Sequence, residues 1–179
     1  FPDRLPLTKL WGRDGFGYLQ MRSNGWKPDS TVLEFKCGDY FWSHNFLNQN
    51  SFYIYHKGRL VIQSGFYDCY GGNHFDHYYS KTISSNSMLI FQPGEFTWTP
   101  IRRPHSDIDK EGFFPEPGGQ RVVAWGAETC FTFREFLSRL HSRQHFETGN
   151  IVAFEHAPDF SYSYICGDAT DAYNNPKYS

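Results

Sequence analysis

Short runs rich in apolar and aromatic residues recur along the chain, with turn-forming Gly, Pro, Asn or Asp residues between them. Runs of this length and composition are typical of β-strands. The predicted strands cover residues 17–23, 30–37, 50–57, 59–67, 86–92, 119–129, 151–157 and 162–167. The Lys57-Gly58 pair, which separates the third run from the fourth, is a tight hairpin signal. This succession predicts a mainly β chain whose antiparallel sheets stack as a β-sandwich.

One segment has the period of a helix instead. Its apolar residues fall on one helix face: Phe133, Phe136, Leu137 and Leu140. Thr132 and Glu135 have the spacing of a capping box at its start. We therefore expect one short helix near 132–143, laid against the sandwich. The stretch from Thr99 to Gly119 is rich in Pro and charge, and it is predicted to be a long polar loop.

Alternation within the run 50–57 also predicts which face of its sheet is buried. If Phe52 and Ile54 point to one face, Tyr53 and Tyr55 point to the other. The Phe/Ile face is the natural core, and the Tyr face is the natural groove.

Composition narrows the possible function classes. Aromatic residues make up 20% of the chain, and with 16 Gly and 10 Pro they favour a β-rich domain with many turns. A net charge of -2 and a pI near 6.5 argue against a nucleic-acid partner, which normally calls for a basic stripe. No apolar run approaches the roughly 20 residues that span a bilayer. The start, FPDRLPLTKLW, lacks the pattern of a signal peptide, but a processed N-terminus would look the same, so export stays open.

The Cys and His residues form no clear metal motif. The four cysteines lie too far apart for a CxxC motif, and both two disulfides and four free thiols remain open: Cys37, Cys69, Cys130 and Cys166. His74 and His77 have a spacing that would share a metal on a helix, but Gly71-Gly72 upstream indicates a loop. Hydrogen-bonded histidines are therefore favoured over a metal pair.

The segment from His44 to Ser87 is crowded with aromatic, His, Asn and Ser residues. A packed core does not require this mixture, because buried strands favour Val, Ile and Leu. Aromatic rings interleaved with amide, hydroxyl and imidazole groups suit a sugar, which offers flat C–H faces and a rim of hydroxyls. The segment therefore predicts a carbohydrate site.

The reactive groups of this segment favour one kind of sugar chemistry. Few acids lie between residues 40 and 95, so hydrolysis by paired carboxylates has little support. Uronate polymers can instead be cut by removing the C5 proton and expelling the 4-linked sugar, which needs a base, an acid and a group that neutralises the carboxylate. Residues of the right kind are His44, Tyr67, Tyr78 and Tyr79. Taken singly, each is more often a packing or hydrogen-bonding residue than a catalytic one.

Most of the chain resembles the β-sandwich domain of the heparinase II/III family of polysaccharide lyases, which follows a helical toroid. The pieces that carry the resemblance are RDGFGYLQMRSNGWKPDSTVLEFKCGDYFWSH, NSFYIYHKGRLVIQSGFYDCYG, YYSKTISSNSMLI and GDATDAYN. The resemblance implies a supersandwich-like fold and β-elimination on an acidic, uronate-containing glycan. It also implies that His44, at the first position of the family's H-x-H-x-D segment, is catalytic. The residues expected to bind substrate are Tyr67, Asn86, Asn48 and His74.

The resemblance also implies three zinc-ligand positions, and none of them keeps its ligand. They are occupied by Phe46, Gln63 and Ser85. Phe cannot bind zinc, and neutral Gln and Ser are poor ligands. We therefore expect neither zinc nor another cofactor.

The family's remaining catalytic groups come from the helical domain, which nothing in this chain resembles. The chain is thus expected to be a single partial β-sandwich domain, 1–179, that partners the helical domain of the same protein and is inactive alone. Family habit implies a bacterial, periplasmic or secreted protein. A sulfated glycan would call for clustered basic residues, and the nearest to such a cluster are Arg102-Arg103, Lys57 and Arg59. A non-sulfated or lightly sulfated polymer is therefore favoured. The alternative is a non-catalytic carbohydrate-binding or scaffold sandwich.

Overall fold

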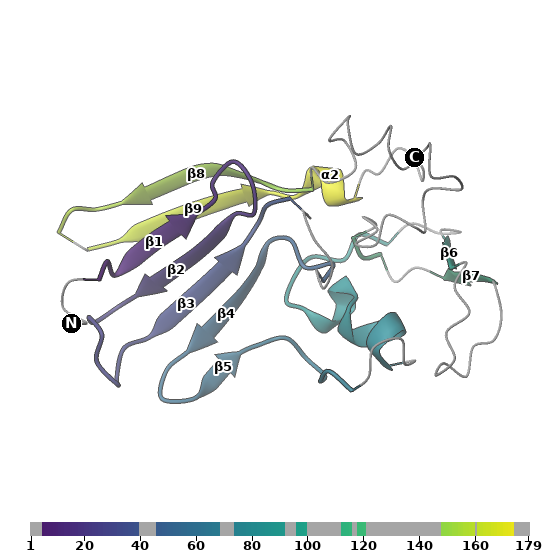
Figure 1. The fold of residues 1–179 in the computed structure, drawn as a ribbon, viewed down its shortest axis with the longest axis horizontal. Coiled ribbons are helices and arrows are strands. Elements are labelled where there is room, and N and C mark those ends of the chain that lie inside the picture. Colours follow the sequence, from purple (N-terminus) through teal and green to yellow (C-terminus); the bar gives the residue numbers. More distant parts are fainter. Residues whose placement is uncertain are drawn as a thin grey trace.

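The computed structural model describes residues 5–39, 46–68, 74–91, 96–99, 112–115, 118–120, 148–159 and 161–173. These residues form a mainly β, sandwich-like fold with few and short helices, as predicted (Figure 1). The strands are β1 (Thr8–Trp11), β2 (Tyr18–Arg22), β3 (Val32–Lys36), β4 (Ser51–Tyr55), β5 (Arg59–Val61), β6 (Phe96–Thr99), β7 (Gly112–Pro115), β8 (Asn150–His156) and β9 (Ser163–Asp168). The helical turns are the π-helical η2 (Phe75–Tyr79), the 3-10 turn η3 (Thr82–Ser84) and α2 (Thr170–Tyr173).

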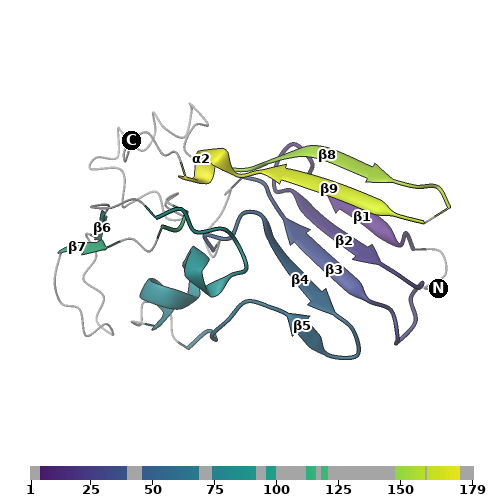
Figure 2. The ribbon, with the colours of Figure 1, turned by 180° about the vertical axis from the view of Figure 1, so that it is seen from behind.

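Strands β1 to β5 form one antiparallel sheet in chain order, and β8 pairs with β9 in a separate hairpin. Across the sheet Leu10 faces Leu19, which faces Phe35, so these apolar residues share one face. The hairpin appears next to β1 in both ribbon views (Figures 1 and 2). The Thr8 hydroxyl lies 3.0 Å from that of Ser163. Leu10 and Phe35 pack against the buried apolar cluster, so the face that carries them is the inner face of the sandwich.

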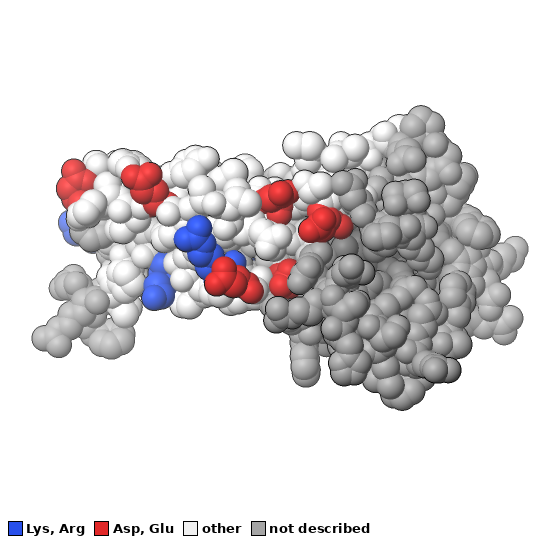
Figure 3. All heavy atoms as spheres, turned by 90° about the horizontal axis from the view of Figure 1, so that it is seen from above, with Lys and Arg blue, Asp and Glu red and all other residues white. Residues whose placement is uncertain are grey.

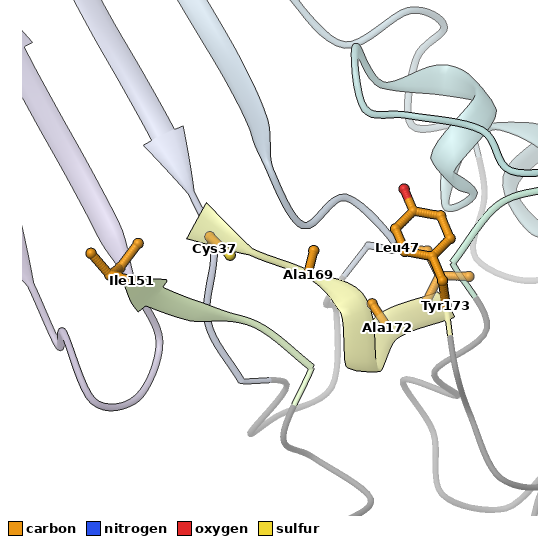
Figure 4. Packing of buried hydrophobic residues seen from close by; sticks show 6 residues of the cluster. All are labelled: Cys37, Leu47, Ile151, Ala169, Ala172 and Tyr173. Atoms are coloured by element: carbon orange, nitrogen blue, oxygen red, sulfur yellow. The ribbon is translucent and has the colours of Figure 1, made fainter. Parts of the chain in front are cut away.

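The hydrophobic core lies where the ends of β3, β8 and β9 meet α2 (Figure 4). Its buried members are Cys37, Leu47, Ile151, Ala169, Ala172 and Tyr173. Segments of the backbone approach each other so closely here that only small residues fit. A Cβ at Gly167 would lie 2.7 Å from the Cys37 sulfur, and one at Gly17 only 1.7 Å from the Cys37 carbonyl oxygen. Cys37 and Cys166 are free thiols.

Beside this core lies a buried network of polar side chains. Gln49 and Gln120 bond reciprocally: the Gln49 N–H donates to the Gln120 side-chain oxygen, and the Gln120 amide donates to the Gln49 carbonyl, both at 2.8 Å. The Gln49 side chain also accepts the Gly38 N–H at 2.8 Å and donates to the Thr148 hydroxyl at 3.0 Å. Thr82 accepts the Gln120 N–H at 2.8 Å. Five segments distant in sequence are thus joined by satisfied buried groups.

Most of the strand predictions are confirmed. The runs 17–23, 30–37, 50–57, 151–157 and 162–167 correspond to β2, β3, β4, β8 and β9. Lys57 has a φ of 54° in the β4–β5 turn, where the hairpin was predicted. In that turn the His56 N–H donates to the Gly58 carbonyl at 2.9 Å.

Three predictions are wrong in part. The run 86–92 is not a strand over its described residues, 86–91, because its polar side chains bond to other backbone segments. The run 59–67 is a strand only in β5, since the side chain of Gln63 is turned to the η2 and η3 segment. The predicted polar loop contains β7, which pairs with β6.

Two predictions fall largely outside the described residues. These are the helix near 132–143 and the strand 119–129, of which only Gly119 and Gln120 are described and lie in no strand. They stay predictions.

Candidate functional site

An aromatic cluster lies where the chain turns through η2 and η3 after β5. Its central residue is Tyr79. The Phe46 ring meets the Tyr79 ring edge-on, with centroids 5.1 Å apart, and Tyr67 approaches the same ring at 6.2 Å. His74 stacks on Tyr79 at 6.3 Å and lies 5.4 Å from Tyr78. Phe46, Tyr67, His74, Phe75, Tyr78 and Tyr79 are called the aromatic cluster below.

The aromatic cluster brings together two of the residues predicted to bind substrate. The side chain of Tyr67 is 48% exposed, and its ring packs edge-on against Phe75 at 5.1 Å. Within the described residues, its hydroxyl has no hydrogen-bond partner. His74 is half-buried, accepts the Phe66 N–H at 3.4 Å and stacks on the Phe66 ring. The cluster therefore presents a phenol and an imidazole on one aromatic support.

The backbone around His74 differs from the expected loop. His74 has helical dihedral angles, φ −63° and ψ −42°, and η2 follows it directly. The Gly-Gly pair upstream suggested a loop, but hydrogen bonds after it close a helical turn: the Ser80 N–H donates to the Phe75 carbonyl at 3.0 Å. Among the described residues, no three His, Cys, Asp or Glu side chains lie close enough to share a metal ion.

Of the three positions at which the resemblance implied zinc ligands, Phe46 and Gln63 lie beside Tyr79, and Ser85 follows Ser84, whose hydroxyl donates to the Tyr79 carbonyl at 2.8 Å. Phe46 packs on the Tyr79 ring, and the Gln63 amide donates to the Tyr79 carbonyl and to the Ser84 hydroxyl. The hydroxyl of Ser85 is buried and has no hydrogen-bond partner within the described residues. A benzene ring, a neutral amide and a hydroxyl do not make a zinc donor set. Aromatic packing and amide hydrogen bonds occupy this place instead.

Asn48 lies on the other side of the sheet from the core, beside Lys36 and Tyr53. Its side-chain oxygen accepts the Lys36 ammonium at 3.0 Å, and its amide donates to the Tyr53 hydroxyl at 3.5 Å. Withdrawal from water lowers the pKa of Lys36 to about 8. The group thus combines an amide, a phenol and an amine that loses its proton more readily than an ordinary lysine.

The amide of Asn86 is engaged with the backbone of β4. Its oxygen accepts the Phe52 N–H at 2.9 Å, and its nitrogen donates to the Phe52 carbonyl. Strand β5 pairs only at Ile54 and Tyr55, so the Asn86 side chain continues the hydrogen bonding along that edge of β4. In this structure the side chain therefore supports the fold, and its predicted contact with substrate is untested.

Segment 46–48 connects the aromatic cluster with the group formed by Asn48, Lys36 and Tyr53. Phe46 belongs to the aromatic cluster, the Leu47 N–H donates to the Ser80 carbonyl at 3.0 Å, and Asn48 reaches Lys36. His44, the predicted catalytic residue, lies outside the described residues, so its position relative to the cluster is a prediction.

Sequence reasoning missed Lys36 and the pair formed by Ser64 and Tyr78, whose hydroxyls lie 2.5 Å apart. Alternation in VLEFK places Lys36 with Glu34 on the outer face of the sheet, so the sequence held a signal for Lys36. Ser64 and Tyr78 belong to segments with no common pattern, and the sequence held no signal for their contact. Opposite Lys36 on the sheet, burial and the nearby Glu34 carboxylate raise the pKa of Tyr18.

Neither a scan against protein-family models nor a search of curated proteins finds a match to this chain. Within the described residues, no helix has the length and hydropathy needed to cross a membrane. On the face seen in Figure 3, acidic and basic side chains are interspersed over the described part rather than gathered by sign.

Proposed function

We propose that this chain is the β-sandwich part of a lyase that cuts acidic, uronate-containing polysaccharides by β-elimination. The observation that supports this most is the aromatic cluster, which holds an exposed Tyr67 phenol beside the His74 imidazole. The flat face of a sugar packs on aromatic rings, and a phenol and an imidazole can form hydrogen bonds with its hydroxyl groups.

The reaction divides into three tasks. A base removes the C5 proton of the uronate, the C4–O4 bond breaks as a C4–C5 double bond forms, and an acid returns a proton to the departing oxygen. His44 is assigned to acid–base chemistry or to neutralising the carboxylate. Tyr67, Asn48, His74 and Asn86 are assigned to substrate binding. The substrate carboxylate must be neutralised, because negative charge accumulates on it as the C5 proton leaves.

A non-catalytic glycan-binding domain is the second candidate. The observation that favours it is the environment of Tyr79, where Phe46 and Gln63 stand at positions that bind metal in the resembled family. The same exposed phenol and imidazole would then hold sugar without cutting it. Either function fits a periplasmic or secreted protein, in contact with polysaccharide, and we propose that location with it.

The test is an elimination assay on a panel of acidic polysaccharides, with the longest protein that contains this chain, following the ultraviolet absorbance of the unsaturated uronate. His44→Ala should lower kcat by about 100- to 10,000-fold, the usual contribution of an acid–base residue. Tyr67→Phe should leave the fold intact and weaken substrate binding. Unsaturated product formed equally fast by His44→Ala would overturn the assignment of His44. No product on any polymer, with binding retained, would replace the lyase by the binding domain.

A further inference from the structure

The outer face of the five-stranded sheet carries a groove of about 510 Å³ over β2 to β5. Two rows of side chains cross its floor. In one row Gln20 lies opposite Glu34, which lies opposite Tyr53. In the next row, Arg22 and Tyr55 flank Val32, and Arg59 on β5 follows Tyr55. All point away from the inner face, because they alternate with its apolar residues.

Basic groups outnumber acidic groups in this groove, although the whole chain has a net charge of -2. Arg22, Lys27 and Arg59 line it, and Glu34 is the one carboxylate among its lining residues. The Gln20 amide donates to the Glu34 carboxylate at 3.2 Å, and Tyr18 also bonds to it. The arginines and the lysine therefore leave an excess of positive charge for a ligand.

Arg22 is held in place but not fully paired. Its guanidinium lies 4.0 Å from the centre of the Trp26 ring, which fixes the side chain by a cation–π contact. Its Nε is buried and has no hydrogen-bond partner among the described residues. A buried donor without an acceptor destabilises a fold, so such a group is a candidate for completion by a ligand. A basic face that is simply solvated would not account for the buried, unpaired Nε of Arg22.

The aromatic part of the floor suits a sugar. Tyr55 is 46% exposed and lies opposite Val32, where β3 begins and β4 ends. Tyr53, one row away, reaches Asn48 through its hydroxyl. The groove thus runs from Arg59 past both tyrosines toward a residue that the proposed function assigns to substrate.

We propose that this groove binds a stretch of a carboxylated glycan, with its sugar rings over Tyr53 and Tyr55 and its carboxylates at Arg22 and Arg59. It is an accessory binding site, separate from the aromatic cluster that contains Tyr67 and His74. The sugar class rests on the proposed function, whereas the groove and its positive charge do not.

Isothermal titration with oligogalacturonate at low salt tests this proposal. The double variant Arg22→Gln/Arg59→Gln and the single variant Tyr55→Ala should each weaken binding about tenfold or more. Arg13→Gln is the matched control, because Arg13 is exposed in the β1–β2 turn, outside the groove. It should bind as the unchanged protein does. Circular dichroism of each variant, which should match that of the unchanged protein, verifies its fold.

Several results would overturn the proposal. One is unchanged oligogalacturonate binding in both groove variants. Another is an equal loss of oligogalacturonate binding in Arg13→Gln. The third is an affinity for an uncharged glucan oligomer equal to that for oligogalacturonate. The lyase proposal fails separately. If binding depends on Arg22 and Arg59 but no elimination occurs, only the groove proposal is supported. If elimination occurs but oligogalacturonate binding is unchanged in the arginine variants, only the lyase proposal is supported.

Discussion

Lys36 shows how a single side chain links the fold to the outer face of the sheet. It lies opposite Tyr18 on one side and Ser51 on the other, and its ammonium donates to Asn48. Partial withdrawal from water favours the neutral amine, which is why its pKa falls to about 8. Since an unfolded lysine keeps its ordinary pKa, near 10.5 in this case, the folded chain binds this proton less tightly than the unfolded chain.

This difference predicts a pH dependence of stability. Between pH 8 and 10.5 the unfolded state binds more protons at Lys36, so the free energy of unfolding rises with pH. Comparison of urea denaturation at pH 7 and pH 9 isolates the effect: the unchanged protein should gain roughly 1 kcal/mol relative to Lys36→Met. The exposed Lys9→Met is the control and should follow the unchanged protein. Parallel pH profiles for the unchanged protein and Lys36→Met would contradict the account. The thiol of Cys37, whose pKa burial raises from 9.0 to about 12, opposes this rise as pH approaches 9, but it does so equally in Lys36→Met and therefore cancels in the comparison.

At the residue scale, alternation predicted the side of β4 on which Tyr53 and Tyr55 lie, whereas Phe52 and Ile54, predicted to be core residues, are only half-buried. Tyr53 and Tyr55 line the groove of the outer face, as the pattern indicated. The bonds of Asn86 and Gln49 could not be predicted. Their partners lie 34 and 71 residues away, and a polar residue in a sequence does not show which distant backbone group it meets.

At the scale of elements, the edge of β4 is completed by a side chain rather than by a strand. Asn86 satisfies both backbone groups of Phe52 where β5 has already ended. The apolar run after Asn86 is not a strand in the described residues. The side chains of Met88 and Phe91 are each 69% exposed. Periodicity could predict β2, β3, β8 and β9, but it could not distinguish this exposed run from a buried strand.

Asn86→Ala tests this role. It leaves the Phe52 N–H and carbonyl without their partner, which should lower the free energy of unfolding by about 1–3 kcal/mol. Chemical denaturation measures the loss. Asn24→Ala, at an exposed position, should change stability by less than about 0.5 kcal/mol. Equal stability of Asn86→Ala and the unchanged protein would show that Asn86 does not support the edge of β4, leaving substrate binding as its assigned role.

At the scale of the whole molecule, a buried polar network joins distant segments of the part of the chain that the structure describes. Gln49, Gln120 and Thr148 are almost completely buried, and they tie the β3–β4 connection to segments near residues 120 and 148. Among the described residues, the buried apolar cluster beside them has six members, two of which are alanines. The composition predicted a β-sandwich. It did not predict a buried polar network, because glutamine and threonine usually lie at the surface.

Gln120→Ala should therefore destabilise the whole domain. It removes the reciprocal bonds with Gln49 and leaves buried groups unpaired, which should cost about 2–4 kcal/mol in the free energy of unfolding. Gln20→Ala is the matched control: its side chain is only half-buried, and its loss should cost less than about 1 kcal/mol. Thermal denaturation followed by circular dichroism compares the two. Similar losses in both variants would contradict a special role for the buried network.

The central claim is that this sandwich serves an elimination rather than a hydrolysis, and product mass tests it most directly. Mass spectrometry of the fragments from a defined uronate oligosaccharide, treated with the longest protein that contains this chain, separates the two reactions. The account predicts fragments whose masses sum to that of the substrate, with the new non-reducing end lighter by one water molecule than a hydrolysis fragment. Fragments that have gained water, or a substrate that stays intact, would contradict it.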